Sequence, residues 1–440
     1  MYKVVVSPLI ERILKDMELR GVRQTDIVKA KKIHSGLLSE ILRGEKSMTL
    51  KVLDSITEVL GLPAGHYYSD YINDYWSRDH AKVRSKNIDV LLKCVEYGLH
   101  DIRDQLVERM IKCGGQVECF FKVAEELFVR KDFENIKSRE RYRFEKADDA
   151  KYFYNLVIEL TVDKRSRALA MSYYRLLQMV STNDIEAAEE HAIKLEEYLK
   201  YIDPNEVLEA YFRIICVYRL IPKWEYVLAW SERLAEVAEK AGDLEYVGEA
   251  LIKAGIAARK LGQFERSLQY IERYEKINIG LFPTYAKGNR LIVLVDSGDT
   301  SKIPELYQFA KDHPDIAHEY LEFLLEALVK NNMHQDVERF FNDFPEQIKK
   351  LFSNRDKKSF WEQHTINYKY YHAVWLLSKG EKAGIDLALD GAEQAAELTL
   401  SNLALMSIDL VLRNDPTKEQ LLRAADILSK LHTCSPLKNS

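Results

Sequence analysis

The stretch Arg23–Lys46, RQTDIVKAKKIHSGLLSEILRGEK, sets the expectations for the rest of the chain. Its apolar residues follow helical spacing in two short runs, which predict one helix over Gln24–Ala30 and a second over about Ser35–Arg43. The first helix turns two aliphatic side chains inward, Ile27 and Val28, and the second turns three: Leu38, Ile41 and Leu42. The second helix then keeps a polar and basic outer face, made of His34, Ser35, Gly36, Ser39, Glu40 and Arg43.

Two short helices at a steep angle, the second with such a face, have the geometry that entry into the DNA major groove requires. The alternative is an ordinary helical hairpin with a charged surface. Over roughly Pro8–Leu62 the sequence resembles the helix-turn-helix of phage-repressor-type (XRE) regulators. That family has a Gln that opens the first helix of the pair, two apolar residues after it and a Ser within the second helix of the pair; here these are Gln24, Ile27, Val28 and Ser39.

The chain departs from the family at two positions of the turn. It has Lys32 where the family usually has Gly, which adopts turn conformations more freely, and His34 where a small capping residue is usual. The resemblance implies base contacts from Ser35, Ser39 and Arg43. It implies phosphate contacts from Gln24, Lys32 and Lys46 and places His34 in the same DNA-binding surface.

Composition predicts an all-α protein of more than one domain. The chain has 440 residues but only 18 Gly and 10 Pro, and few turn formers favour helices with short connections. The net charge of −5 is uneven, because residues 1–60 carry +3 and residues 61–440 carry −8. A slightly basic head on an acidic body suits a protein whose head alone touches phosphate, and so weak a positive charge predicts a homodimer that binds with two heads.

The five cysteines, Cys94, Cys113, Cys119, Cys216 and Cys434, form no CxxC pair. We expect buried thiols in a reducing cytosol rather than a disulfide framework or a metal site. No run is long or apolar enough for a signal peptide or a membrane span, which predicts a cytoplasmic protein.

Further helices are predicted on both sides of the central stretch. Ser7-Pro8 reads as a helix start and Thr49 as the cap of a helix that ends at Gly61. The segment His66–Trp76, HYYSDYINDYW, is rich in aromatic residues but lacks interleaved Lys or Arg, so base stacking is poorly supported. Its rings are expected to dock the small domain on the next part of the chain or to bury a dimer seam.

Beyond about residue 150 the sequence becomes repetitive, with units of roughly 33 to 45 residues. The clearest unit, Val247–Ile277, has small residues in its first helix and a turn at Leu261–Phe264, and it resembles the tetratricopeptide repeat. Related turns recur at 297–299, 330–333 and 379–381, with looser candidates at 182–184, 222–224 and 414–416. Stacked helix pairs of this kind form a superhelix whose first helices line a concave groove.

The repeat register nominates groove residues for a peptide: Arg219, Arg259, Asn289, Arg290, Glu322, Asn367, Tyr370 and Asn402. Asn367 and Asn402 fall at equivalent places in successive units, and Asn can both donate to and accept from a peptide backbone. The three arginines suit a carboxylate. The alternative for each residue is an ordinary solvated position on a helix face. The sequence carries no catalytic motif, so we expect a non-enzyme without metal or cofactor.

The combination of an XRE-type head and a tetratricopeptide-like array resembles the RRNPP peptide-sensing regulators of Gram-positive bacteria and their phages, most of all the arbitrium receptors. The resemblance implies a homodimeric transcription factor that binds a double-stranded operator and a short signalling peptide. The expected domains are 1–65 for the head, 66–150 for a helical linker, 151–431 for the array with the dimer seam in about 365–431, and 432–440 for a polar tail. An array that binds a protein partner, or an adaptor or enzyme inhibitor whose head does not bind DNA, are the alternatives.

Overall fold

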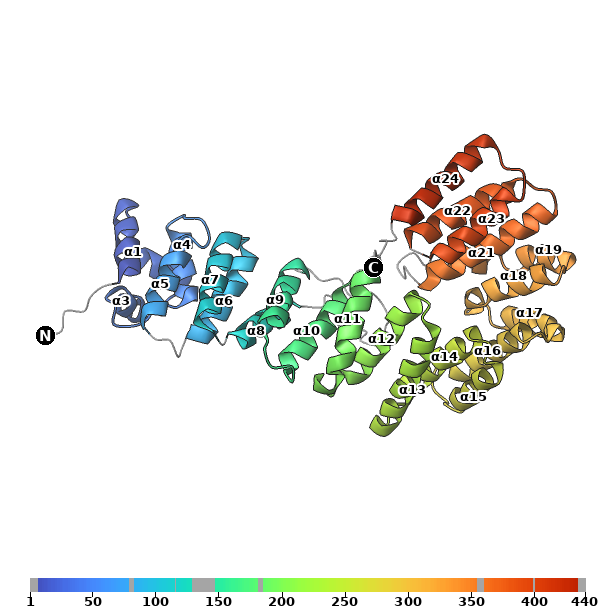
Figure 1. Ribbon diagram of the computed structural model, residues 1–440. Helices are drawn as coiled ribbons and strands as arrows, with labels where there is room; N and C mark the ends of the chain where they lie inside the picture. Colours follow the sequence, from blue (N-terminus) through green and yellow to red (C-terminus); the bar gives the residue numbers. More distant parts are fainter. Residues whose placement is uncertain are drawn as a thin grey trace. The chain divides into compact units, whose positions relative to one another are not determined.

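The computed structural model describes residues 7–78, 83–114, 116–128, 147–180, 185–353, 360–398 and 400–433. These residues form 24 α-helices and three short 3-10 helices, as expected for an all-α chain (Figure 1). They divide into two compact units, the first ending at Met179 and the second beginning at Val180. Cys434 and the predicted polar tail beyond residue 433 lie outside the described residues.

The first unit contains ten helices within the described residues. They are α1 Pro8–Leu19, α2 Gln24–Lys31, α3 Ser35–Leu42, α4 Leu50–Val59, α5 Tyr68–Arg78, α6 Val83–Glu96, α7 His100–Cys113, α8 Val117–Leu127, α9 Ala147–Leu160 and α10 Arg167–Met179. Ser7 and Thr49 cap α1 and α4 as predicted, each accepting from a backbone N–H of the first turn. A cap of this kind stabilises a helix by about 1 kcal/mol.

A small apolar core holds the first four helices together. Its fully buried side chains come from all four of them: Ile10, Ile13, Ile27, Leu38, Ile41, Leu53 and Ile56. Val28, predicted to face inward, is only half-buried. Burying one such aliphatic side chain contributes about 1.5–3 kcal/mol, so this core is sufficient to define the arrangement of four short helices.

The aromatic segment 66–76 docks the small domain onto the neighbouring helix α6, which confirms the first of the two interpretations. Its Tyr and Trp rings are buried. Three of its hydroxyls donate to other helices: Tyr67 to Asp16 of α1 (2.6 Å), Tyr68 to Asp54 of α4 (2.8 Å) and Tyr75 to Asn87 of α6 (2.7 Å). When the hydroxyl of a buried Tyr donates a hydrogen bond, the ring contributes its apolar burial and no buried polar atom is left unsatisfied.

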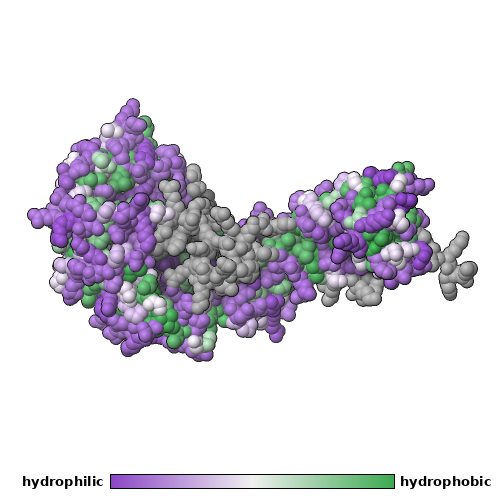
Figure 2. Space-filling model, turned by 180° about the vertical axis from the view of Figure 1, so that it is seen from behind, coloured by the Kyte–Doolittle hydropathy of each residue, from purple (hydrophilic) through white to green (hydrophobic). Residues whose placement is uncertain are grey.

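The second unit is an array of helix pairs. Its helices are α11 Ile185–Tyr198, α12 Val207–Leu220, α13 Trp224–Ala241, α14 Leu244–Lys260, α15 Phe264–Glu275, α16 Phe282–Asp296, α17 Ile303–Asp312, α18 Leu321–Lys330, α19 His334–Asp343, α20 Pro345–Ser353, α21 Phe360–Ser378, α22 Ala383–Glu397, α23 Ser401–Leu412 and α24 Lys418–Thr433. Most of the surface visible in Figure 2 is hydrophilic, with apolar residues in separate patches.

Most of the turns predicted from sequence contain a residue in the left-handed backbone region; the looser candidate at 222–224 contains none, and the one at 182–184 lies outside the described residues. Gly262, Gly298 and Gly380 have φ of 73°, 105° and 78°, and the turns without Gly place Asn332 and Asp415 there, at 55° and 49°. Gly, Asn and Asp are the residues that adopt this region at least cost, which is why these short turns could be found from the sequence.

Polar contacts between successive repeats follow the repeat length. Arg266 contacts Glu232 at 2.7 Å, Arg273 contacts Glu239 at 2.8 Å, and Gln420 contacts Asp386 at 2.7 Å. Each of these pairs is 34 residues apart in sequence. The separation lies within the period of 33 to 45 residues expected from the sequence, because equivalent helices of neighbouring units lie side by side in such an array.

Candidate functional site

The turn between α2 and α3 is built around Lys32. Its φ of 51° and ψ of 35° lie in the left-handed region, at the position where the XRE family usually has Gly. A side chain in this region costs roughly 1–2 kcal/mol, so the surrounding core must hold the turn against that strain. His34 then begins α3 without a side-chain capping bond.

The residues nominated for DNA contact lie on α3, at the start of α2 and in the turns on either side of α3, and they are accessible. Gln24, Lys32, His34, Ser35, Arg43 and Lys46 are exposed, and Ser39 is half-buried. Inward-facing Leu38, Ile41 and Leu42 fix the helix to the core. The face therefore presents polar side chains on a short, anchored helix.

Two ion pairs occupy the basic side chains of this face. The Arg43 guanidinium donates to both carboxylate oxygens of Glu45 at 2.9 Å, and Lys46 lies 2.6 Å from Glu40. The hydrogen bond from Lys46 lowers the pKa of Glu40, and the bond to Glu45 raises the pKa of Arg43. Any phosphate or base must therefore compete with a carboxylate for these two cations.

In the second unit, side chains of α12, α14, α16, α18 and α21 meet on one side of the array, here called the inner face. Gln363 of α21 donates to the Leu220 carbonyl oxygen at the end of α12, at 3.4 Å, across 143 residues of sequence. Arg259 of α14 forms an ion pair with Asp296 of α16, and its guanidinium lies 4.9 Å from the centre of the Phe323 ring on α18. Helices far apart in sequence thus contribute to the same surface.

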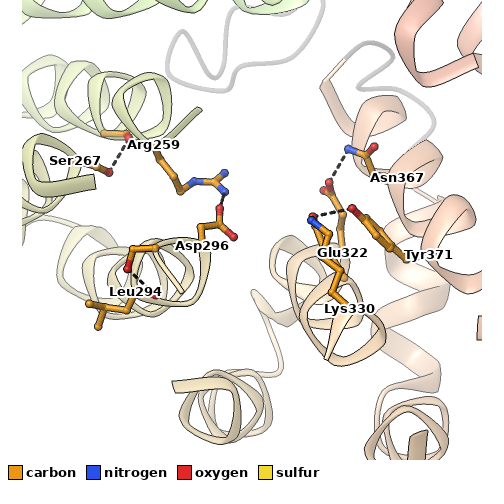
Figure 3. Close-up of polar contacts among 11 residues, drawn as sticks. Arg259, Ser267, Leu294, Asp296, Glu322, Lys330, Asn367 and Tyr371 are labelled. Atoms are coloured by element: carbon orange, nitrogen blue, oxygen red, sulfur yellow. Dashed lines mark hydrogen bonds and ion pairs between the residues drawn. The ribbon is translucent and has the colours of Figure 1, made fainter. Parts of the chain in front are cut away.

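A second group on the inner face surrounds Glu322 of α18, which is only 3% exposed. His364 contacts one of its carboxylate oxygens, and Asn367 donates to the other at 2.7 Å. Burial alone would raise the pKa of Glu322, but His364 and the more distant Lys260 outweigh it, so the pKa is lowered. Figure 3 shows Arg259 of α14 directed at Asp296 of α16, and Asn367 of α21 directed at Glu322 of α18.

Lys260, next to Arg259, differs from the other cations of the inner face. Its side chain is exposed, yet surrounding protein atoms desolvate it and lower its pKa, with a smaller effect from Arg259 in the same direction. Glu322, Glu326 and Asp296 act in the opposite direction. We define the inner cluster as Arg259, Lys260, Asp296, Glu322, His364 and Asn367.

The structure brings together only some of the residues nominated for peptide binding. Arg259, Glu322 and Asn367 belong to the inner cluster. Arg290 instead pairs bidentately with Glu275 of α15, at 2.6 and 3.1 Å, and Asn289 donates to the Tyr274 hydroxyl at 2.9 Å. The remaining three are placed separately: Arg219 half-buried on α12, Tyr370 half-buried on α21 beside Tyr371, and Asn402 exposed on α23.

Sequence reasoning missed Asp296, Lys260 and the role of His364. A signal for Asp296 exists, since it follows Arg259 by 37 residues, about one repeat, and opposite charges in phase with a repeat can pair. His364 had no ligand spacing with the other histidines, because its partner is an acid 42 residues earlier. Tyr371 was also missed; it donates at 2.7 Å to Glu326, which Lys330 also contacts at 2.5 Å.

Three other findings bear on function. Among the described residues, no group of three His, Cys, Asp or Glu side chains could hold a metal ion. In the same parts of the chain, no helix is both long and apolar enough to cross a bilayer. The expectation of buried thiols is wrong at Cys113, which is exposed at the end of α7, whereas Cys94 and Cys119 are buried and Cys216 is half-buried.

Comparison with known proteins gives distant likenesses. No family model matches the chain, and no curated protein matches its sequence. Similar solved structures include the apo form of RapI, at 11% identity and a TM-score of 0.34 over 72% of this chain and 100% of that one. A Rap protein complexed with competence and sporulation factor gives 12% identity and a TM-score of 0.38, over 78% and 99%. At these TM-scores the likenesses carry no argument about the activity or partners of this chain.

Proposed function

We propose that the protein is a DNA-binding transcriptional regulator whose array binds a short signalling peptide. The observation that carries the first part is the outer face of α3, which presents Ser35, Ser39 and Arg43 on a helix anchored by buried aliphatic residues. A helix with such a face fits the major groove, where Arg reads guanine bidentately and Ser accepts or donates to any base edge. Lys32 and Lys46 flank the face and suit phosphate contacts.

The test of DNA binding is selection of bound fragments from a genomic library, followed by anisotropy titration of the selected site. Arg43→Ala should weaken specific binding about tenfold or more, since a lost bidentate contact to a base removes discrimination. Lys46→Ala should weaken all sequences alike and reduce the salt slope by about 1. Lys240→Ala, an exposed cation on α13, is the matched control. If wild type selects no site, the α3 face does not read DNA.

The proposed peptide site is the inner face of the second unit. It offers charged and amide groups from four helices, including Arg259, Glu322 and Asn367. An amide already bonded to a buried carboxylate can exchange that bond for one to a peptide backbone only if the local packing adjusts. Binding and rearrangement of α18 against α21 would then be linked, which is a route to signalling.

Capture of hexapeptides from a random pool on immobilised protein, identified by mass spectrometry, tests peptide binding. For a captured peptide, Asn367→Ala should cost about 1–3 kcal/mol of affinity by calorimetry, because it leaves peptide groups unpaired. Asn331→Ala, in the turn after α18, serves as the control. Failure to capture any peptide would favour a protein partner for the array.

We further propose a homodimer formed through α23 and α24. Four leucines of these helices remain between 43% and 64% exposed: Leu405, Leu412, Leu421 and Leu422. An apolar surface of this kind is usually an interface, although Ile408 and Ile427 of the predicted seam are buried inside the unit. Light scattering should give about twice the chain mass of 51.2 kDa. Leu422→Asp should halve it and Leu244→Asp, an exposed leucine of α14, should not; a monomeric wild type rejects the dimer.

A further inference from the structure

The cations of the inner face differ in whether they already have a partner. Arg259 is paired with Asp296, Lys330 with Glu326, and His364 with Glu322. Among the residues that the structure describes, Lys260 forms no hydrogen bond or ion pair. Its ammonium is influenced by three carboxylates of α16 and α18, but each of them is engaged with another partner.

An ammonium in this position is unfavourable without a ligand. Its surroundings remove part of its hydration, and no protein group replaces the lost hydrogen bonds. Arg259, the residue before it, adds repulsion. An anion that reached Lys260 through its exposed side would relieve both costs, and the pairing would be stronger than at an open surface because water is partly excluded.

We propose that Lys260 binds a carboxylate of the peptide ligand, and that the arginines of the array do not. The inference rests on the proposed peptide-binding function and assigns the ligand's chemistry at that site. Arg259 is committed to Asp296 and Phe323, and Arg290 to both oxygens of Glu275, so a ligand carboxylate would have to break an existing contact to use either. Lys260 has three donors and no such contact to give up.

The carboxylate can come from the C-terminus or from an Asp or Glu side chain of the peptide. Both present the same group to an ammonium. A structural role for Lys260 is the competing explanation, in which it offsets the charge of Glu322 from a distance. That role predicts a change in stability on substitution but no preference for one form of peptide terminus.

The test uses two random hexapeptide pools, one with free C-terminal acids and one with C-terminal amides, captured on wild type and on Lys260→Gln. If the C-terminus is the source, wild type should bind a selected peptide about tenfold more tightly as the acid than as the amide. Lys260→Gln should abolish that preference and leave affinity for the amide unchanged. If the source is a side chain, the amide pool should yield peptides enriched in Asp or Glu, and their capture should need Lys260.

Lys240→Gln is the matched control and should behave as wild type, and thermal unfolding checks that each variant is folded. Peptides bound equally as acid and amide, without acidic enrichment, would overturn the assignment while leaving peptide binding in place. A preference for acids that survives in Lys260→Gln would overturn it as well. Capture of nothing from either pool would instead reject peptide binding itself, and the Lys260 assignment with it.

Discussion

The ion pairs of the head and those of the inner cluster have the same chemistry but opposite surroundings. On the head, the Arg43 and Glu45 side chains are 59% and 47% exposed. In the inner cluster, the Arg259 side chain is 7% exposed and its partner Asp296 is 37% exposed, while the side chains of His364 and Glu322 are 13% and 4% exposed. An exposed pair contributes little, because water and salt replace each partner easily, whereas removing one partner of a buried pair leaves an unpaired charge in the protein.

The difference separates two ways of binding a charged ligand. Arg43 and Lys46, which follow α3, can exchange their carboxylate partners for a DNA phosphate or base at small cost. Their existing ion pairs therefore do not prevent the proposed contacts. Arg259 cannot do the same, which is why an unpaired cation beside it, Lys260, is the better candidate for a ligand carboxylate. In the head, the ion pairs orient exposed side chains that can still exchange partners. In the array, the ion pairs connect neighbouring helices.

The largest effect should come from removing the carboxylate at the centre of the inner cluster. Glu322→Ala should lower the free energy of unfolding by about 3–5 kcal/mol, because His364 and Asn367 lose their common partner in a buried site. Urea unfolding followed by circular dichroism measures the change. Glu305→Ala, which removes an exposed partner of Lys302, should leave the midpoint unchanged. If both substitutions lowered the free energy of unfolding equally, buried and exposed ion pairs would not differ in their contribution to stability.

His372 provides a pH test of the array's interior. Its ring packs 4.5 Å from that of Phe341, and burial lowers its pKa from 6.5 to about 4, against a small opposing effect of Glu381. Between these two values the unfolded chain binds a proton that the folded chain does not, so stability falls as the pH decreases from about 6.5 toward 4. The expected loss between pH 7.5 and pH 5 is about 2 kcal/mol.

His372→Phe should remove most of that pH dependence, since Phe preserves the ring packing and cannot be protonated. The measurement is the urea midpoint at the two pH values for both proteins. The window lies above the range in which Glu322 titrates: its lowered pKa means that its own contribution is present above its ordinary value of 4.5 and is lost only as the pH falls below that. A wild type equally stable at both pH values would contradict the burial argument.

Much of the fold was predictable because its signals are local. Ser7 and Thr49 cap helices by bonds within one turn, and the turn at Gly262 needs a residue that tolerates positive φ. The repeat period was also readable, because each unit repeats the same small residues and turns. Positions that depend on distant packing were harder to predict: Val28 was expected to face inward but is only half-buried.

The sites were less predictable, because side-chain partners depend on three-dimensional neighbours. Helical register placed Arg259 and Asn367 on the inner face but could not reveal that Asp296 and Glu322 occupy them. Likewise, the departure at Lys32 gave no indication that the chain keeps the left-handed turn with Lys in place of Gly. Cross-helix contacts of this kind arise from residues 37 to 45 apart, beyond any local pattern.

The packing of α16 at Gly288 predicts a smaller effect on stability, and Gly255 of α14 provides the control. A Cβ at Gly288 of α16 would lie 2.4 Å from the Tyr320 ring and 2.6 Å from the Phe309 ring, whereas one at Gly255 of α14 would meet nothing closer than 3.8 Å. Gly288→Ala should therefore destabilise the array by about 1–3 kcal/mol through overpacking. Gly255→Ala should be neutral or stabilise by up to about 1 kcal/mol, because Ala favours the helix. Two equal midpoints in urea would mean that α16 can shift, and that Asp296 is not held rigidly opposite Arg259.

The smallest expected effect on stability comes from removing Glu45, the exposed partner of Arg43 in the head. Glu45→Ala removes the carboxylate that holds Arg43 and leaves the buried core of the head untouched. Because the pair is exposed, the unfolding midpoint should not change. If α3 reads DNA as proposed, affinity for the selected site should rise about two- to fivefold, since one negative charge leaves the phosphate-facing surface and Arg43 no longer has to exchange partners. The measurement is anisotropy titration at two salt concentrations, with Glu18→Ala on α1 as a control that removes an equal charge elsewhere on the head. A fall in affinity would show that Glu45 positions Arg43 for its base, so that the exposed pair of the head, like the buried pairs of the array, serves to hold a side chain in place.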